Sequence, residues 1–307
     1  MEKSNTFIFP VIRTDLLEQS LKTLYRHTPD NFYVYVIDNS LDGIDKSLYK
    51  YIHHYIKPYR NLGFSKSFNT GLSLVETPYV TTCNDDVEFI NYRWWEGVLK
   101  TFDKVDKATP DKKCLLVTPS SIKLPDWSVG RPSGDHFYIK EYKEFYTEED
   151  YDSLLNEDHY VNEHLTIKPD TVIDGVTLYC SVFRTDLIRE LGGLDERFFP
   201  GSGEDYNLCC HSNMLGYRSV GTTLSWVFHH WSSSIGMINE FEKQQLIDPN
   251  RVWNNLSEIW GEGRHDIWGA KCSVCGENMR QIGKTEYATC SKEHEKYKIP
   301  DVVKAPL

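Results

Sequence analysis

Acidic residues follow two apolar, strand-like runs of the sequence. Asp38 ends the first run, and the second run is followed directly by Asn84, Asp85 and Asp86. Adjacent carboxylates repel each other unless a positive charge lies beside them, and a divalent cation with oxygen ligands would relieve that repulsion. Taken singly, each segment is also explained by a surface turn, because Asn and Asp are favoured in turns.

Two more carboxylates and two histidines occur later in the chain. Glu204 and Asp205 follow the Gly-rich residues 198–203, which would deliver both carboxylates to the start of a helix. The positive end of the helix dipole alone could account for acidic residues there. His229 and His230 end another apolar run. A buried histidine with satisfied hydrogen bonds is the alternative to a metal ligand for either of them.

A segment of small and polar residues opens an expected helix at 60–71. It contains Asn61, Gly63, Asn69 and Gly71. The free N–H groups and the dipole at a helix start attract anions, so a phosphate could bind there. A capped helix start without a ligand is the alternative interpretation.

Three cysteines and a histidine near the end of the chain have the spacing of a zinc site. Cys272 and Cys275 form a Cys-x2-Cys pair, and Cys290 and His294 form a Cys-x3-His pair. Two such pairs suit tetrahedral Zn2+ without an open position, which predicts a structural zinc. Coincidental thiols are the alternative. This mildly basic segment could dock on the rest of the chain, bind a partner or contact nucleic acid.

Strands and helices alternate in the first part of the chain. Strands are expected at 7–12, 33–38 and 79–83, with helices at 15–25 and 65–75, and Thr14 is the expected cap of the first helix. This order predicts an α/β, Rossmann-like, mainly parallel sheet flanked by helices. In such sheets ligands bind beyond the carboxyl ends of the strands. Further elements are expected as strands at 173–183 and 218–230 and helices at 186–191 and 204–215.

Composition shifts suggest the domain organisation. Residues 1–240 are the predicted catalytic domain, within which the acidic stretch 135–170 is a solvated insertion or a lid over an acceptor site. Residues 241–268 form a helical, turn-rich connector, and 269–307 form the predicted zinc-binding module, resembling a zinc ribbon or knuckle.

The overall composition excludes several classes of protein. The 307 residues include 34 Lys and Arg against 45 Asp and Glu, a net charge of −11 that disfavours general binding of polyanions. No apolar run is long enough for a membrane-spanning helix, so membrane insertion is not expected. The first residues lack the pattern of an export signal, and the scattered cysteines indicate reduced thiols, which together predict a cytoplasmic protein.

In combination, these segments resemble the family 2 glycosyltransferases with the GT-A fold. The similarity extends from about residue 7 to residue 234. It rests on the Asp-Asn-Ser end of the second strand, two Asn-x-Gly patterns, and an Asn-Asp-Asp-Val at the family's DxD position. Further sequence segments that match the family lie at 192–199, 203–208, 216–217 and 229–234.

The resemblance implies a nucleotide-sugar-dependent hexosyl- or pentosyltransferase that inverts the configuration of the sugar. It implies that Asp205 is the general base beside Glu204, and that Asp86 and His229 hold catalytic Mn2+ or Mg2+. The spacing to Ser234 favours His229 over His230. The residues implied to bind the nucleotide sugar are Asp38, Asn39, Asn61, Gly63, Asn69, Asn84 and Asp85.

The same resemblance implies a UDP- or dTDP-linked sugar as donor. The acceptor is expected to be a glycan or a hydroxylated base in DNA, and Asn207 and His211 depart from the residues usual on the acceptor side. Two other functions remain open. One is a catalytically silent GT-A scaffold that binds nucleic acid or protein through its zinc module. The other is a nucleotidyltransferase, although the Gly-rich basic loop that such enzymes need is missing from residues 13–16.

Overall fold

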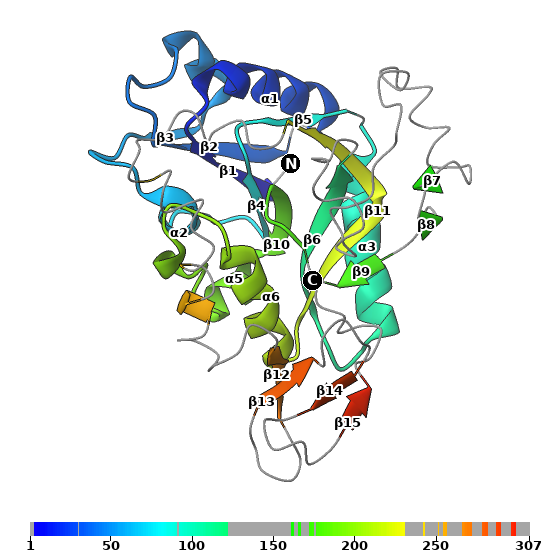
Figure 1. The fold of residues 1–307 in the computed structure, drawn as a ribbon. Coiled ribbons are helices and arrows are strands. Elements are labelled where there is room, and N and C mark those ends of the chain that lie inside the picture. The colour runs from blue at the N-terminus through cyan, green and yellow to red at the C-terminus, as the bar shows by residue number, and fades with distance from the viewer. Residues whose placement is uncertain are drawn as a thin grey trace.

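The computed structural model describes most of the predicted catalytic domain. Continuous description covers residues 3–29, 31–90, 92–121 and 176–230. Shorter described segments are 161–162, 165–166, 172–174, 242, 251, 254–256, 266–271, 278–281, 287–289 and 296–298. Nine of the described strands form one sheet with helices on both faces (Figure 1).

Four parallel strands form one half of this sheet: β1 (Asn5–Val11), β2 (Phe32–Asp38), β3 (His54–Ile56) and β4 (Tyr79–Cys83). Their order is β3-β2-β1-β4. Phe7 and Phe9 of β1 point into one hydrophobic core and Ile8 into the other, as strand geometry requires. Because the four strands are parallel, their carboxyl ends meet at one edge of the sheet.

The other half of the sheet is mixed. β10 (Cys180–Arg184) lies antiparallel between β4 and β6 (Cys114–Ser121), and β11 (Arg218–His229) runs parallel to β6. Two short strands, β5 (Val87–Phe89) and β9 (Val172–Asp174), pair antiparallel with β11.

The prediction of a mainly parallel sheet is therefore wrong. Half of the strand pairings in the described sheet are antiparallel. Two of these pairings involve β10, which lies between β4 and β6 and runs in the opposite direction, and the other two join β5 and β9 to β11. The predicted single strand at 173–183 is also wrong, because β9 and β10 pair with different partners.

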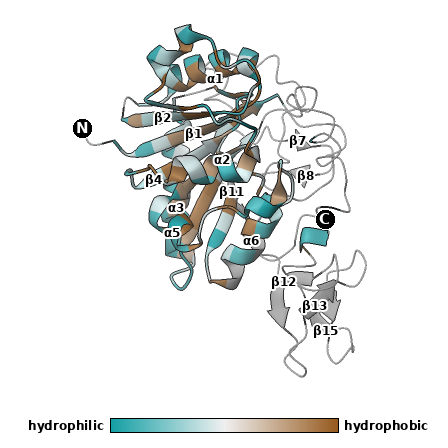
Figure 2. Ribbon diagram, turned by 90° about the vertical axis from the view of Figure 1, so that its left-hand side faces the viewer, coloured by the Kyte–Doolittle hydropathy of each residue, from teal (hydrophilic) through white to brown (hydrophobic). Residues whose placement is uncertain are grey.

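Helices cover the sheet according to their apolar faces. α1 (Thr14–His27) and α3 (Trp94–Ala108) pack on the face that contains Phe7, while α2 (Gly63–Leu72), α5 (Thr185–Glu190) and α6 (Glu204–Met214) pack on the face that contains Ile8. Figure 2 shows hydrophobic residues along the strands and hydrophilic residues on the exposed sides of α1 and α6. Burial of these apolar faces, at roughly 25 cal/mol per Å², is the main stabilisation of the three layers.

The start of α1 differs from the sequence expectation. Thr14 is the first helical residue, and Arg13 occupies the cap position without a side-chain cap hydrogen bond. The chain just before the helix is held by Asp85 in the turn after β4, which accepts hydrogen bonds from the N–H groups of Ile12 and Arg13. α3 and β6 are additional to the elements expected from the sequence.

The C-terminal part contains a separate antiparallel sheet in the order β12 (Asp266–Lys271), β13 (Asn278–Gln281), β14 (Tyr287–Thr289) and β15 (Lys296–Lys298). β12 lies next to α6 (Figure 1) and begins three residues before the predicted module boundary at 269. The zinc ligands predicted at Cys272, Cys275, Cys290 and His294 lie outside the described residues, so that site stays a prediction.

The acidic stretch 135–170 also lies mostly outside the described residues. Its described part is two short paired strands, β7 (Val161–Asn162) and β8 (Leu165–Thr166). Among the helices that the structure describes, none combines the length and the apolar character needed to cross a membrane.

Candidate active site

The strand directions bring Asp38, the turn of Asn84 to Asp86 and His229 to one edge of the sheet. β1, β2, β3 and β4 are parallel, and two successive antiparallel pairings through β10 and β6 return β11 to the same direction. Asp38, the turn after β4 and His229 therefore all lie where parallel strands end. This is the edge at which α/β sheets bind ligands.

The turn after β4 is held by hydrogen bonds between its backbone and three other segments. The N–H of Asn84 donates to the carbonyl of Tyr179 (2.8 Å), and the N–H of His230 donates to the carbonyl of Asp86 (3.0 Å). The hydroxyl of Ser20 donates to the carbonyls of Asp85 (2.9 Å) and Val87 (2.5 Å). A turn fixed in this way presents the Asp86 side chain in one position.

Asp86 and His229 meet although they are far apart in sequence. The distance from Asp86 Oδ1 to His229 Nε2 is 3.1 Å, and both side chains are 5% exposed. Asn84 Nδ2 lies 3.3 Å from the same nitrogen. His229, rather than His230, is thus the histidine that faces the acidic turn.

His230 has a different partner. Its Nε2 lies 2.7 Å from Glu88 Oε1, while Gln19 Nε2 donates to the other oxygen of Glu88 (3.2 Å). The hydrogen bond with His230 lowers the pKa of Glu88, against the opposing effect of burial. Glu88 and His230 form a second acid–histidine pair, which was not predicted from the sequence. The signal was present, because Glu88 is a charged residue between the apolar Val87 and Phe89 of β5.

The Asp85 carboxylate faces the protein backbone. Its Oδ2 accepts hydrogen bonds from the N–H groups of Ile12 (2.6 Å) and Arg13 (2.5 Å), which join the end of β1 to the end of β4. Burial and the neighbouring charge of Asp86 raise the pKa of Asp85 to about 7. A nucleotide-binding role is predicted for Asp85, whereas its observed contacts are structural.

Asp38 is fully buried and surrounded by donors. Its Oδ1 accepts from the N–H (2.9 Å) and the hydroxyl (2.5 Å) of Ser40, with Lys57 Nζ at 3.3 Å. Its Oδ2 accepts from the hydroxyl of Tyr55 (2.6 Å). Burial and this hydrogen bond raise the pKa of Tyr55 well above its ordinary value.

The start of α2 is joined to β2 by amide side chains. Asn39 donates to Ser67 Oγ (2.9 Å) and accepts from the N–H of Leu62 (2.9 Å), and Asn61 accepts from the N–H of Gly63 (2.8 Å). Gly63 has a φ of +72°, and a Cβ there would overlap Phe199 and Pro200. A glycine is therefore required where α2 meets the loop that precedes α6.

Asn69 binds the backbone of the same region. Its Oδ1 accepts from the N–H of Leu194 (2.8 Å) and its Nδ2 donates to the carbonyl of Leu194 (2.8 Å), so the amide pairs with one residue in both directions. A Cβ at Gly193 would overlap Asn69 Oδ1. Asn39, Asn61 and Asn69 thus all use their side chains to assemble the edge of the predicted nucleotide site.

The two acidic residues at the start of α6 have different environments. Glu204 is buried, and its Oε2 has no hydrogen-bond partner among the described residues. Burial and the charge of Asp205 raise the pKa of Glu204 to about 8, although Arg251 partly opposes the shift. Asp205 is half-buried, and its Oδ1 accepts from the N–H of Tyr206 (2.7 Å). Burial thus favours the protonated form of Glu204, which lies next to the more accessible carboxyl group of Asp205.

The pair formed by Asp86 and His229 fits a divalent cation. Two ligands at about 2.1 Å from an ion, in the right-angle arrangement of an octahedral site, are about 3 Å apart, and the observed distance is 3.1 Å. A carboxylate oxygen suits both Mn2+ and Mg2+, whereas an imidazole nitrogen suits a transition metal such as Mn2+ better than Mg2+. No group of three or more His, Cys, Asp or Glu side chains is placed to hold a metal within the described part of the chain.

Ser20 is a site residue that sequence reasoning missed. It lies on the buried face of α1 together with Leu17, Leu21 and Leu24. A serine on an otherwise apolar helix face is a signal in the sequence that its hydroxyl has a buried partner. The carbonyls of Asp85 and Val87 are those partners.

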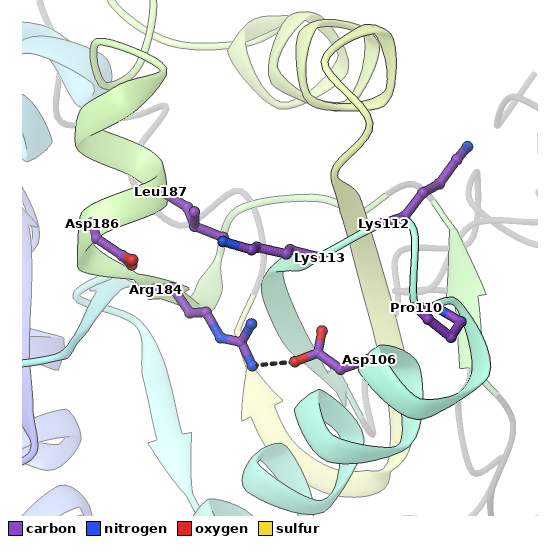
Figure 3. A pocket seen from close by; sticks show the side chains of 7 residues that line it. All are labelled: Asp106, Pro110, Lys112, Lys113, Arg184, Asp186 and Leu187. Carbon is purple, nitrogen blue, oxygen red and sulfur yellow. Dashed lines mark hydrogen bonds and ion pairs between the residues drawn. The ribbon is translucent and has the colours of Figure 1, made fainter.

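A cavity of about 280 Å³ lies at the opposite edge of the sheet. Its lining includes Arg184, which pairs with Tyr79 at the start of β4, and Lys113, which precedes β6. Figure 3 shows the Arg184 guanidinium directed at Asp106, with which it forms an ion pair at 2.6 Å. None of the predicted site residues lines this cavity, which is separate from the candidate active site.

Residues 8–111 match the family model described as Glycosyl transferase family 2. The matched range is about a third of the chain and contains the segments of Asp38, Asn61 to Asn69, and Asn84 to Asp86. For this range the predicted resemblance is confirmed. The range ends before Asp205 and His229. No curated protein matches the sequence.

Two solved structures are similar to this chain. The first is the mannosyltransferase PcManGT from Pyrobaculum calidifontis in complex with GDP-Man and Mn2+, with 17% identity and a TM-score of 0.48 over 77% of this chain and 60% of that one. The second is GalNAc-T7 with UDP, GalNAc and Mn2+, with 12% identity and a TM-score of 0.48 over 75% of this chain and 44% of that one. The match thus spans roughly half the length of these two proteins.

Removing the Asp85 carboxylate should destabilise the protein. Asp85→Ala leaves the N–H groups of Ile12 and Arg13 without their acceptor, at an expected cost of about 1 to 3 kcal/mol in the free energy of unfolding. Asp85→Asn retains one acceptor oxygen and should cost less than half as much. The raised pKa of Asp85 lowers the stability of the wild type above pH 4, so urea unfolding of both variants is measured at pH 4, close to the ordinary pKa of 3.8. An alanine variant as stable as the wild type at that pH would show that these hydrogen bonds contribute nothing.

The raised pKa of Glu204 should make stability depend on pH. Between its ordinary pKa of 4.5 and the folded value of about 8, the folded chain holds a proton that the unfolded chain has lost, so stability falls as pH rises. Glu204→Gln removes this contribution. The stability of the wild type relative to Glu204→Gln should therefore decline from pH 5 to pH 8, by at most about 1.4 kcal/mol per pH unit. A difference that does not vary with pH, measured by urea unfolding, contradicts the burial effect.

Proposed function

We propose that this protein is a divalent-metal-dependent glycosyltransferase that moves a hexosyl or pentosyl group from a nucleoside diphosphate sugar to an acceptor hydroxyl, inverting its configuration. The observation that carries the proposal is the 3.1 Å contact between Asp86 and His229 at the carboxyl edge of the sheet. The match of residues 8–111 to Glycosyl transferase family 2 supports the same class of reaction.

Asp86 and His229 would hold the metal, Mn2+ or Mg2+. When bound, such an ion neutralises the charge that develops on the departing nucleoside diphosphate. The turn of Asp86 is held before any donor binds, because hydrogen bonds tie it to Ile12 after β1, to Ser20 of α1 and to His230 after β11. A site prepared in this way needs little reorganisation when the donor binds.

Asp205 is the proposed general base. Its carboxylate accepts the proton of the acceptor hydroxyl, whose oxygen attacks the anomeric carbon while the bond to the diphosphate oxygen breaks on the opposite face. Burial and the charge of Asp205 raise the pKa of Glu204, which favours the protonated form of Glu204 beside Asp205.

The donor and acceptor are proposed from the resemblance described above. The donor is a UDP- or dTDP-linked sugar, and the acceptor is a glycan hydroxyl or a hydroxylated base in DNA. Asn39 and Asn61 act indirectly in this proposal, since their contacts shape the start of α2 beside the nucleotide. A catalytically silent scaffold is the competing proposal.

Release of nucleoside diphosphate distinguishes these possibilities. The purified full chain is incubated with Mn2+ and a panel of UDP-, dTDP- and GDP-sugars, with glycans and hydroxymethylated DNA as acceptors. We expect release with one donor class, loss of that release with EDTA, and loss of more than 90% of it in Asp86→Asn. Absence of release across the panel would favour the silent scaffold.

The role of Asp205 is tested separately. Asp205→Asn retains the shape of the side chain but removes its basicity, so turnover should fall by about 100-fold or more. Affinity for the donor, measured by calorimetry with the nucleoside diphosphate, should stay within about threefold of the wild type. An unchanged turnover number in this variant would remove Asp205 from the role of base.

A further inference from the structure

The side chain of Tyr179 lies flat against the imidazole of His229. The two ring centres are 4.8 Å apart and the ring planes differ by 18°. Tyr179 is 3% exposed and His229 4% exposed, so this contact is fully inside the protein. A stacked neighbour limits rotation of the imidazole about the bond that joins the ring to its Cβ.

Tyr179 also contacts the two strands that frame the site. Its hydroxyl donates a hydrogen bond to the carbonyl of Pro119 in β6, which fixes the outer end of the phenol ring. Its own carbonyl accepts the N–H of Asn84 at 2.8 Å. One residue therefore touches β6, the histidine at the end of β11 and the first residue of the acidic turn.

The orientation of the His229 ring decides where Nε2 points. Torsions of this kind have broad minima, so an unsupported imidazole rotates readily. In the structure Nε2 lies 3.1 Å from Asp86 Oδ1, and the stacked Tyr179 ring occupies the space into which the imidazole would otherwise turn. Groups that orient the ligands of a metal commonly change its affinity 10- to 100-fold when they are removed.

We propose that Tyr179 is a positioning residue that holds His229 and the Asn84 turn in the arrangement that binds the divalent metal. The inference rests on the proposed function, because it assigns the metal to Asp86 and His229. Tyr179 itself supplies no ligand. Its contribution is the plane of the imidazole, through the ring, and the position of the turn, through its backbone carbonyl.

Three variants separate the ring from the hydroxyl and from general packing. Tyr179→Leu removes the stacked ring, and Tyr179→Phe retains it but loses the hydrogen bond to Pro119. Tyr35→Leu is the matched control, since Tyr35 is a buried tyrosine of the other hydrophobic core. Tyr179→Met, which retains more of the buried volume, serves if the leucine variant fails to fold.

The test measures the affinity of the full chain for Mn2+ alone. Electron paramagnetic resonance detects the ion that remains free in solution, and the bound fraction is obtained by difference. Pulsed measurements of the same samples detect the imidazole nitrogen coupled to Mn2+. We expect Tyr179→Leu to weaken binding about tenfold and reduce the nitrogen signal, Tyr179→Phe to remain within about threefold of the wild type, and Tyr35→Leu to bind normally.

The possible failures are distinguishable. If His229→Ala weakens binding but Tyr179→Leu binds Mn2+ with wild-type affinity and nitrogen signal, the positioning role is wrong and the metal site stands. If the wild type shows no nitrogen signal, or His229→Ala binds as the wild type does, the metal assignment of the proposed function fails and the role of Tyr179 fails with it. An equal loss of affinity in Tyr35→Leu would show a general packing effect and overturn the proposal.

Discussion

The hydrogen bonds from the N–H groups of Ile12 and Arg13 to the Asp85 carboxylate connect the neighbouring parallel strands β1 and β4 just beyond their carboxyl ends. This connection fixes the turn that carries Asp86, and it also fixes the chain that leads into α1. It requires a buried carboxyl group beside a second one, and the pKa of Asp85 rises to about 7 as a result. Burial of this carboxyl group is unfavourable, and the hydrogen bonds that fix the turn in one conformation compensate for it.

Most of the polar residues at this edge serve the scaffold. Asn39 and Asn69 bind backbone groups of neighbouring segments, and Asp38 is enclosed by Ser40, Tyr55 and Lys57. The groups whose environment suits chemistry are fewer: the pair of Asp86 and His229, and the two carboxyl groups at the start of α6. At this edge of the sheet, the identity of a polar residue alone therefore does not tell whether the residue stabilises the fold or takes part in catalysis.

The local elements follow from short-range patterns. Leu17, Leu21 and Leu24 define the buried face of α1, and the apolar run at 79–83 forms β4 with the expected bounds. The reversed direction of β10 could not be predicted, because its sequence is compatible with either direction and its partners β4 and β6 are distant in the chain. The start of α1 was misplaced for a similar reason, because Asp85, in the turn after the distant strand β4, holds the N–H groups of Ile12 and Arg13 just before the helix.

The candidate site divides in the same way. The amino-acid sequence determined which groups are available, including the acidic turn after a strand, the carboxylates at the start of α6 and a histidine at the end of an apolar run. Only the tertiary structure decided that His229 faces Asp86, that Asp85 binds backbone, and that the Tyr179 ring stacks on the imidazole. These contacts join segments from different strands, and their geometry depends on the packing of the whole sheet, which no local pattern specifies.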